Sequence, residues 1–155
     1  MAGIKKVAHV VLGVRDPQRS IEFYTKALGM ECVNYFDDME MAFFSFGEHD
    51  HDLAVIKVPD EQPVGSAGLA HVALEIDGGE AELRALYEKL KDYGAQVEFT
   101  ADHVITRSVY FLDPDGNRLE IFSQEMAPAV AKQTLQHFTA ARDMLRPLDL
   151  ETATE

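Results

Sequence analysis

The sequence predicts an α+β protein made of two βαβββ modules followed by a C-terminal helix. Two observations support this. Segments of alternating apolar and polar residues, typical of strands, are interrupted once in each half by a segment with helical spacing. In addition, Ala8-His9-Val10-Val11-Leu12 recurs as Ala70-His71-Val72-Ala73-Leu74. A duplicated unit with an imidazole at the same place in each copy suggests a site between the copies.

The first module is expected over residues 4–58. Its first strand, 4–14, alternates strictly, and Asp16 and Pro17 then suit the cap and first turn of a helix. That helix has an apolar stripe and stops at Gly29. Three short strands should complete the module, at 31–36, 40–47 and 52–58.

Proline and glycine break both periodicities over 59–68, which therefore reads as a linker. The second module, 69–123, should repeat the order with a strand at 69–76, a helix at 79–92 and strands at 95–100, 106–112 and 117–123. Gly116 supplies the positive φ of a turn before the last strand.

Residues 128–146 have the spacing of an added helix that Pro147 would end, and 149–155 are expected to fray. Both modules and this helix are taken as one domain, 1–155.

Composition narrows the function classes. The chain has 155 residues, a hydrophobic fraction of 46% and a net charge of −13, so it would repel a phosphate backbone and nucleic acid is not expected as a partner. Its apolar runs are far shorter than a membrane span, and the N-terminus has no signal-peptide pattern. A single cysteine, Cys32, excludes an intramolecular disulfide, so a cytoplasmic location is expected.

Three side chains are the candidate metal ligands. His9, His71 and Glu120 each lie on a predicted strand and point away from its apolar packing face, because side chains alternate along a strand. Two imidazoles and one carboxylate suit a divalent first-row metal that keeps open coordination positions. For any one of them alone, a half-exposed strand residue would be the simpler interpretation.

The sequence resembles the vicinal oxygen chelate superfamily of glyoxalases, bleomycin-resistance proteins and type I extradiol dioxygenases. Three stretches carry the resemblance: His9-Val10-Val11-Leu12 leading to Ser20-Ile21-Glu22-Phe23-Tyr24 and Leu28-Gly29-Met30, then His71-Val72-Ala73-Leu74, then Tyr110 through Glu120. The resemblance implies paired βαβββ modules whose mixed sheets curl into a cup. It also implies that His9, His71 and Glu120 bind the metal there.

The reaction class depends on a fourth ligand. In the family that the sequence resembles, glyoxalases bind the metal with a further carboxylate on the last strand of module one. In this sequence Ala54 occupies that position, which matches Glu120 of module two. A three-ligand site is typical of non-haem Fe(II) oxygenases. Fe(II) is therefore the expected cofactor, with Mn(II), Ni(II) or Zn(II) as alternatives.

His103 and Tyr110 are the candidate catalytic residues. The resemblance to dioxygenases implies that a histidine and a tyrosine at such places contact the bound diol. Tyr110 could instead be a packing aromatic, and His103 a loop residue. The family pattern has glycine after this histidine, where Val104 stands here.

A further histidine that the family pattern places before the second metal ligand is also missing. The nearest candidate is His51, but strand parity places it on the packed side of the strand. His49 and His51 are expected instead to form an exposed turn pair flanked by acidic residues.

Three functions remain open. The leading hypothesis is an extradiol dioxygenase that cleaves a small catechol-like diol with O2. The second is a glyoxalase-like metal-dependent isomerase, epimerase or thiol transferase, and the third is a binding protein of the bleomycin-resistance type. A small molecule is the expected partner in each, together with O2 in the first. A homodimer is expected from the apolar surface of the last helix, which could alternatively cap its own chain.

Overall fold

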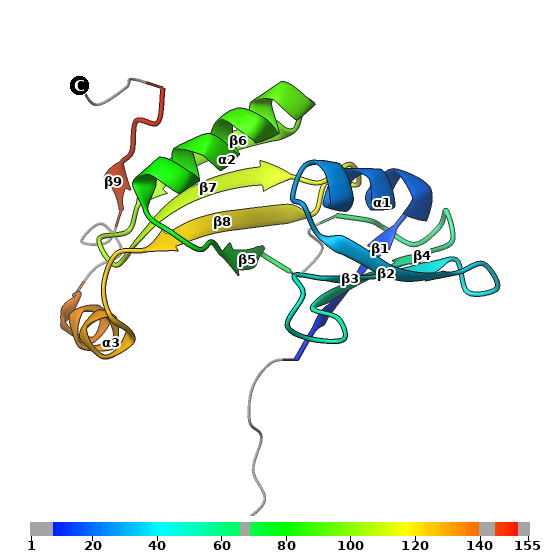
Figure 1. Cartoon of the computed structure of the whole chain (residues 1–155), viewed down its shortest axis with the longest axis horizontal. Coiled ribbons are helices and arrows are strands. Elements are labelled where there is room, and N and C mark those ends of the chain that lie inside the picture. The colour runs from blue at the N-terminus through cyan, green and yellow to red at the C-terminus, as the bar shows by residue number, and fades with distance from the viewer. Residues whose placement is uncertain (1–7, 66–68, 140–144, 152–155) are drawn as a thin grey trace, which may run out of the picture. The chain divides into compact units, whose positions relative to one another are not determined.

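The computed structural model describes residues 8–65, 69–139 and 145–151 (Figure 1). The chain divides into two compact units, Met1–Ala67 with Pro114–Asn117, and Gly68–Asp113 with Arg118–Glu155. Each is a βαβββ module, and the α+β class and paired modules predicted from the sequence are confirmed. No helix in the described part of the chain is long and apolar enough to cross a membrane.

Unit 1 is a four-stranded sheet with one helix. Its elements in chain order are β1 (Val10–Val14), α1 (Pro17–Lys26), β2 (Glu31–Phe36), β3 (Met41–Ser45) and β4 (Leu53–Lys57). The sheet order is β1-β4-β3-β2, with β1 parallel to β4 and the other pairs antiparallel. As predicted, Asp16 caps α1, its carboxylate accepting from the backbone N–H groups of Gln18 and Arg19.

The core of unit 1 forms where α1 covers one face of this sheet. Phe23 and Tyr24 of the helix are fully buried and meet edge to face, with ring centroids 5.3 Å apart. The Tyr24 ring also meets that of Phe44, with centroids 5.1 Å apart. Alternate residues of the strands are buried: Leu12, Val14, Phe44, Leu53 and Val55. Each large apolar side chain buried in this way contributes about 1.5–3 kcal/mol. The strands therefore have a fixed covered face, and Val11, which has the opposite parity, is exposed.

A buried aspartate anchors the turn 114–117 within unit 1. The Asp115 carboxylate accepts from the backbone N–H of Arg15 at 2.9 Å and pairs with the Arg19 guanidinium at 3.1 Å. Gly116 has φ +82°, so the predicted left-handed turn position is confirmed. The Arg15 guanidinium also donates to the carbonyl of Pro59 at 2.6 Å, which fixes the start of the predicted linker.

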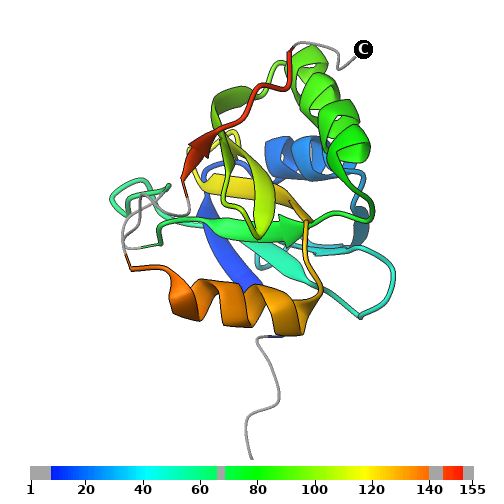
Figure 2. The ribbon, with the colours of Figure 1, turned by 90° about the vertical axis from the view of Figure 1, so that its left-hand side faces the viewer.

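Unit 2 repeats the order and adds to it. It contains β5 (Val72–Glu75), α2 (Glu80–Tyr93), β6 (Gln96–Asp102), β7 (Thr106–Leu112), β8 (Arg118–Gln124), α3 (Pro128–His137) and β9 (Arg146–Pro147). The sheet order is β5-β8-β7-β6-β9. Figures 1 and 2 show α2 above this sheet and α3 below it. The α2 face buries Leu83, Leu90, Val109, Phe111, Leu119 and Ile121.

The duplication is exact at the level of strand register. The parallel pair β1–β4 aligns Val11 with Ala54, and the parallel pair β5–β8 aligns Ala73 with Glu120. Val11 and Ala73 stand at the same place in the repeated sequence, two residues after His9 and His71. The predicted equivalence of Ala54 and Glu120 is therefore confirmed. Module one has no carboxylate where module two has one.

The chain after α3 differs from the prediction. The helix ends at His137, because Phe138 is extended, with ψ 134°, and residues 145–147 are not helical. Residues 140–144, part of the predicted helix, lie outside the described residues. Arg146 precedes a proline, which favours extended backbone, and Pro147 suits an edge strand because it lacks an N–H. The pair forms β9 against β6.

The prediction of a frayed tail is wrong for residues 149–151. Leu150 is buried, and its carbonyl accepts from the Arg84 guanidinium of α2. The hydroxyl of Tyr87 donates to the Glu151 carboxylate at 2.8 Å, and Thr100 donates to the carbonyl of Leu148 at 2.5 Å. These contacts hold the segment against the α2 side of unit 2.

Candidate active site

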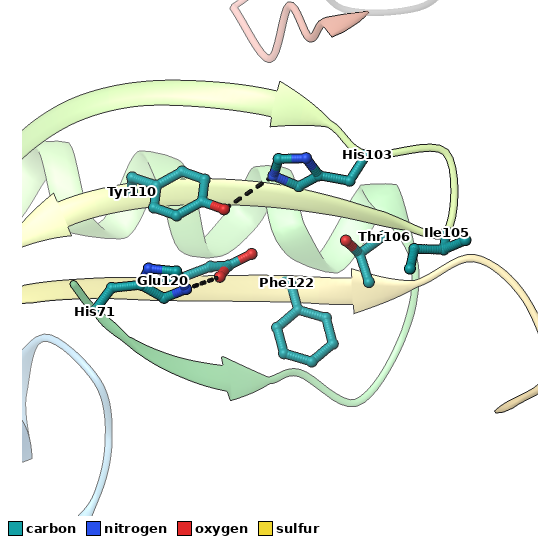
Figure 3. A pocket seen from close by; sticks show the side chains of 7 residues that line it. All are labelled: His71, His103, Ile105, Thr106, Tyr110, Glu120 and Phe122. Carbon is teal, nitrogen blue, oxygen red and sulfur yellow. Dashed lines mark hydrogen bonds and ion pairs between the residues drawn. The ribbon is translucent and has the colours of Figure 1, made fainter. Parts of the chain in front are cut away.

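A cavity of about 330 Å³ opens in unit 2 on the face of the sheet opposite α2. It is lined by His71, His103, Ile105, Thr106, Tyr110, Glu120 and Phe122 (Figure 3). Strand parity creates it, because Val109, Leu119 and Ile121 pack under α2 and the residues between them point the other way. Four of the sequence-predicted site residues therefore line one cavity.

His71 and Glu120 lie together at one side of the cavity. His71 Nε2 is 3.0 Å from Glu120 Oε2, and the Glu120 side chain is only 8% exposed. A buried carboxylate requires a polar or charged partner, and here the imidazole is that partner. The spacing also fits a shared metal ion, since two donors about 2.1 Å from one ion and at right angles are about 3.0 Å apart.

Tyr110 and His103 form the opposite wall. The Tyr110 hydroxyl is 2.9 Å from His103 Nε2, a hydrogen bond whose donor depends on the imidazole tautomer (Figure 3). Phe99 stacks on the Tyr110 ring at 4.3 Å between centroids, and the His71 ring meets it edge to face at 5.5 Å. The phenol is thus held from two sides, with its hydroxyl directed along the cavity.

The environment of Tyr110 keeps its phenol protonated. Burial is the main cause and raises the pKa of Tyr110 to about 12, with a further contribution from the negative charge of Glu120. The two residues are direct cross-strand neighbours in β7 and β8. At neutral pH the phenol therefore keeps a proton that it can donate in a hydrogen bond.

The loop that carries His103 has an unusual backbone. Val104 adopts φ +71°, a left-handed conformation that β-branched residues rarely adopt. Two bonds impose it: Val104 N–H donates to the Asp102 carboxylate at 2.6 Å, and His103 N–H donates to the Thr106 carbonyl at 2.8 Å. Glycine, the residue expected here from the family pattern, would adopt this φ without strain. Because valine stands at position 104 where the family pattern has glycine, the backbone is strained beside the cavity.

In unit 1 the sequence prediction of an exposed turn pair is wrong for His51, whose side chain is half-buried. Its ring lies 4.4 Å from that of His9 and 5.2 Å from that of Phe43, so it is not on the packed face. Strand parity failed because β4 begins only at Leu53, and His51 belongs to the preceding irregular loop. His49 is exposed, as predicted. The acidic residues and the glycine of 47–52 indicate a loop, in which the alternation of side chains along a strand does not apply.

The predicted three-ligand set draws on both units. His71 and Glu120 belong to unit 2 and His9 to unit 1. Glu120 lies on β8 as predicted, but His9 and His71 each lie one residue before a strand rather than on it, because β1 and β5 begin at Val10 and Val72. Among the described residues, no three His, Cys, Asp or Glu side chains are grouped around one point. The set His9, His71 and Glu120 therefore stays a prediction.

Comparison with known proteins identifies the family. The family model for the glyoxalase/bleomycin resistance protein/dioxygenase superfamily matches residues 6–121. The chain belongs to this superfamily.

Relatives within the superfamily catalyse different reactions. Biphenyl-2,3-diol 1,2-dioxygenase 2 of Rhodococcus globerulus is 31% identical over 78% of the chain, which spans only 64% of that enzyme. Lactoylglutathione lyase of Escherichia coli O157:H7 is also 31% identical, over 79% of the chain and 95% of the lyase. The fosfomycin resistance protein FosX of Listeria monocytogenes shares the fold, with a TM-score of 0.63 and 20% identity over 80% of the chain and 97% of FosX. Membership of the superfamily therefore does not determine the reaction, which has to be inferred from the residues of the site.

We expect Val104→Gly to stabilise the protein by about 1 kcal/mol, because relief of left-handed strain of about 1–3 kcal/mol outweighs the entropy cost of glycine. Urea unfolding would measure this. Val104→Ala is the matched control, since it removes the same side chain but keeps the unfavourable Cβ. Equal destabilisation by both substitutions would contradict the assignment of strain.

In metal-free protein, we expect one tyrosine to ionise near pH 12, well above the ordinary value of about 10. Between these values the unfolded chain loses a proton that folded Tyr110 retains, so the folded state loses stability as pH rises through this window. Ultraviolet titration of tyrosinate would show the late transition, and Tyr110→Phe should remove it. An unchanged titration curve in that variant would contradict the prediction.

Proposed function

We propose that the protein is a metal-dependent, extradiol-type dioxygenase that cleaves a small catechol-like diol with O2. The observation that carries the proposal is the cavity in which the His71–Glu120 pair faces the hydrogen-bonded His103–Tyr110 pair. Its volume suits a single substituted ring. The similarity to a biphenyl-diol dioxygenase supports the same chemistry.

We propose His9, His71 and Glu120 as the residues that hold the metal. The 3.0 Å spacing of the two donors in unit 2 supports this, as does Ala54, which leaves module one without a matching carboxylate. Fe(II) is the ion that this donor set and reaction favour. When bound, iron would bring diol and O2 together and pass electron density between them.

The cavity residues would position the diol and move its protons. Tyr110, protonated at neutral pH, would donate a hydrogen bond to a diol oxygen. With that proton directed at the diol, His103 would donate its Nε2–H to the phenol oxygen, and its other ring nitrogen would accept a proton from the substrate and later return it. The side chains of Ile105 and Phe122 would contact the apolar edge of the ring.

A glyoxalase-like isomerase, epimerase or thiol transferase is the second candidate. The similarity to lactoylglutathione lyase favours it, because the chain spans 95% of that enzyme and only 64% of the dioxygenase. Its chemistry would consume no O2. Oxygen uptake by the Fe(II)-loaded protein with a panel of substituted catechols separates the two candidates.

We expect Glu120→Ala to abolish activity through loss of metal, whereas Tyr110→Phe and His103→Ala keep the metal and slow turnover. Loss of the single donor at Tyr110 should cost up to about 10²–10³-fold. Loss of the acid–base group at His103 should cost about 10²–10⁴-fold. The measurements are oxygen uptake, formation of ring-opened product and metal content.

Tyr87→Phe is the matched control for Tyr110→Phe, because it removes a hydroxyl that bonds Glu151 on the α2 side of the sheet, away from the cavity. Its turnover should equal that of the wild type. If no catechol in the panel supports oxygen uptake, the dioxygenase proposal fails and the second candidate takes its place.

We also propose that the protein is a homodimer. Val130 and Leu135 of α3 are 51% and 47% exposed, which leaves apolar surface on this helix uncovered by the described chain. Light scattering should therefore give about twice the monomer mass of 17.3 kDa at micromolar concentration. Leu135→Glu should weaken association, and Lys132→Glu, an exposed charge change on the same helix, serves as its control. A monomer mass for the wild type would refute the dimer.

A further inference from the structure

His51 is a second imidazole beside His9. The two ring centroids are 4.4 Å apart, with an angle of 38° between the ring planes. Two imidazoles bound at right angles to one ion, each with its donor nitrogen about 2.1 Å away, would have centroids about 4.6 Å apart. The separation of the two rings is therefore compatible with joint binding of one metal ion.

The orientation of His51 is fixed by a carboxylate. Its Nδ1 is 2.8 Å from Asp50 Oδ2, and Phe43 meets its ring edge to face at 5.2 Å. An imidazole that donates its Nδ1–H to a carboxylate carries its lone pair on Nε2, and metal-bound histidines commonly have such a partner. The His51 side chain is 20% exposed and the Asp50 side chain 87% exposed. His51 therefore lies inward of the acid that orients it.

The same face of unit 1 lacks a donor where module two has one. Phe43 is the direct cross-strand neighbour of Ala54, so both side chains lie on one face of the sheet. The contact between His51 and Phe43 places the imidazole on that face too. His51 thus reaches, from the loop before β4, the surface on which Ala54 cannot supply a ligand.

We infer that His51 is a metal ligand that acts together with His9, replacing the carboxylate that Ala54 lacks with an imidazole. The inference rests on the proposed function, since His9 belongs to the proposed metal site. It adds a nitrogen donor to the set, which favours first-row transition metals over Mg²⁺ or Ca²⁺. In the protein without substrate, His51 would occupy one of the coordination positions that the three proposed ligands leave open, and a bound diol would displace it from the metal.

The test counts the imidazoles and measures affinity on the full-length protein. With Cu(II) as probe, pulsed electron paramagnetic resonance should detect three bound imidazoles in the wild type and two in His51→Ala. Competition with a chromophoric chelator for Zn(II) should show binding at least about 10–100-fold weaker in His51→Ala. Asp50→Asn, which keeps His51 but removes its charged acceptor, should weaken binding by about 10–100-fold.

His49→Ala is the matched control, because His49 is an exposed histidine in the same loop. It should keep three imidazoles and the wild-type affinity. If His51→Ala also keeps three bound imidazoles and the wild-type affinity, while His71→Ala and Glu120→Ala lose the metal, the inference about His51 is wrong and the proposed metal site stands. If the wild type binds metal no more tightly than His9→Ala and His71→Ala, the inference and the proposed metal site are both refuted.

Discussion

The register of the parallel pair β5–β8 is the constraint on which the cavity of unit 2 depends. Side chains alternate along a strand, so a slip of one residue would turn Glu120 under α2 and expose Leu119 and Ile121. The apolar packing of that face fixes the register. The same packing therefore determines that Glu120, Tyr110 and Phe122 share the opposite face. The placement of the polar site follows from the apolar core.

Burying Glu120 has consequences for its neighbours. A carboxylate that is almost excluded from water depends on His71 for a partner. Its charge also acts on Tyr110 across the strand pair and opposes ionisation of the phenol. One buried acid thus links the candidate metal ligands with the candidate catalytic pair. The strained backbone at Val104 holds His103 at the other end of this network.

The sequence predicted much of this arrangement, because strand periodicity and the repeat are both local signals. They located most of the strands to within a few residues and placed Glu120 and Tyr110 on the correct face, although β1 begins only at Val10. Elsewhere no local signal existed. His51 lies in an irregular loop, where alternation does not apply, and only the folded chain shows that its ring meets His9. At Arg146, which the helical spacing included in the last helix, pairing with β6 decides the conformation, and this contact is remote in sequence.

The contacts of residues 148–151 and of Asp115 also bear on how the chain folds during synthesis. Unit 2 cannot complete its packing until Leu150 has left the ribosome, because Arg84 donates a hydrogen bond to its carbonyl and its side chain is buried on the α2 side of the sheet. Unit 1 has its whole four-stranded sheet by residue 57 but lacks the partner of the Arg15 amide until Asp115 emerges. Both modules therefore gain some of their contacts from residues synthesised long after most of their strands, so during vectorial synthesis the packing of both is completed late.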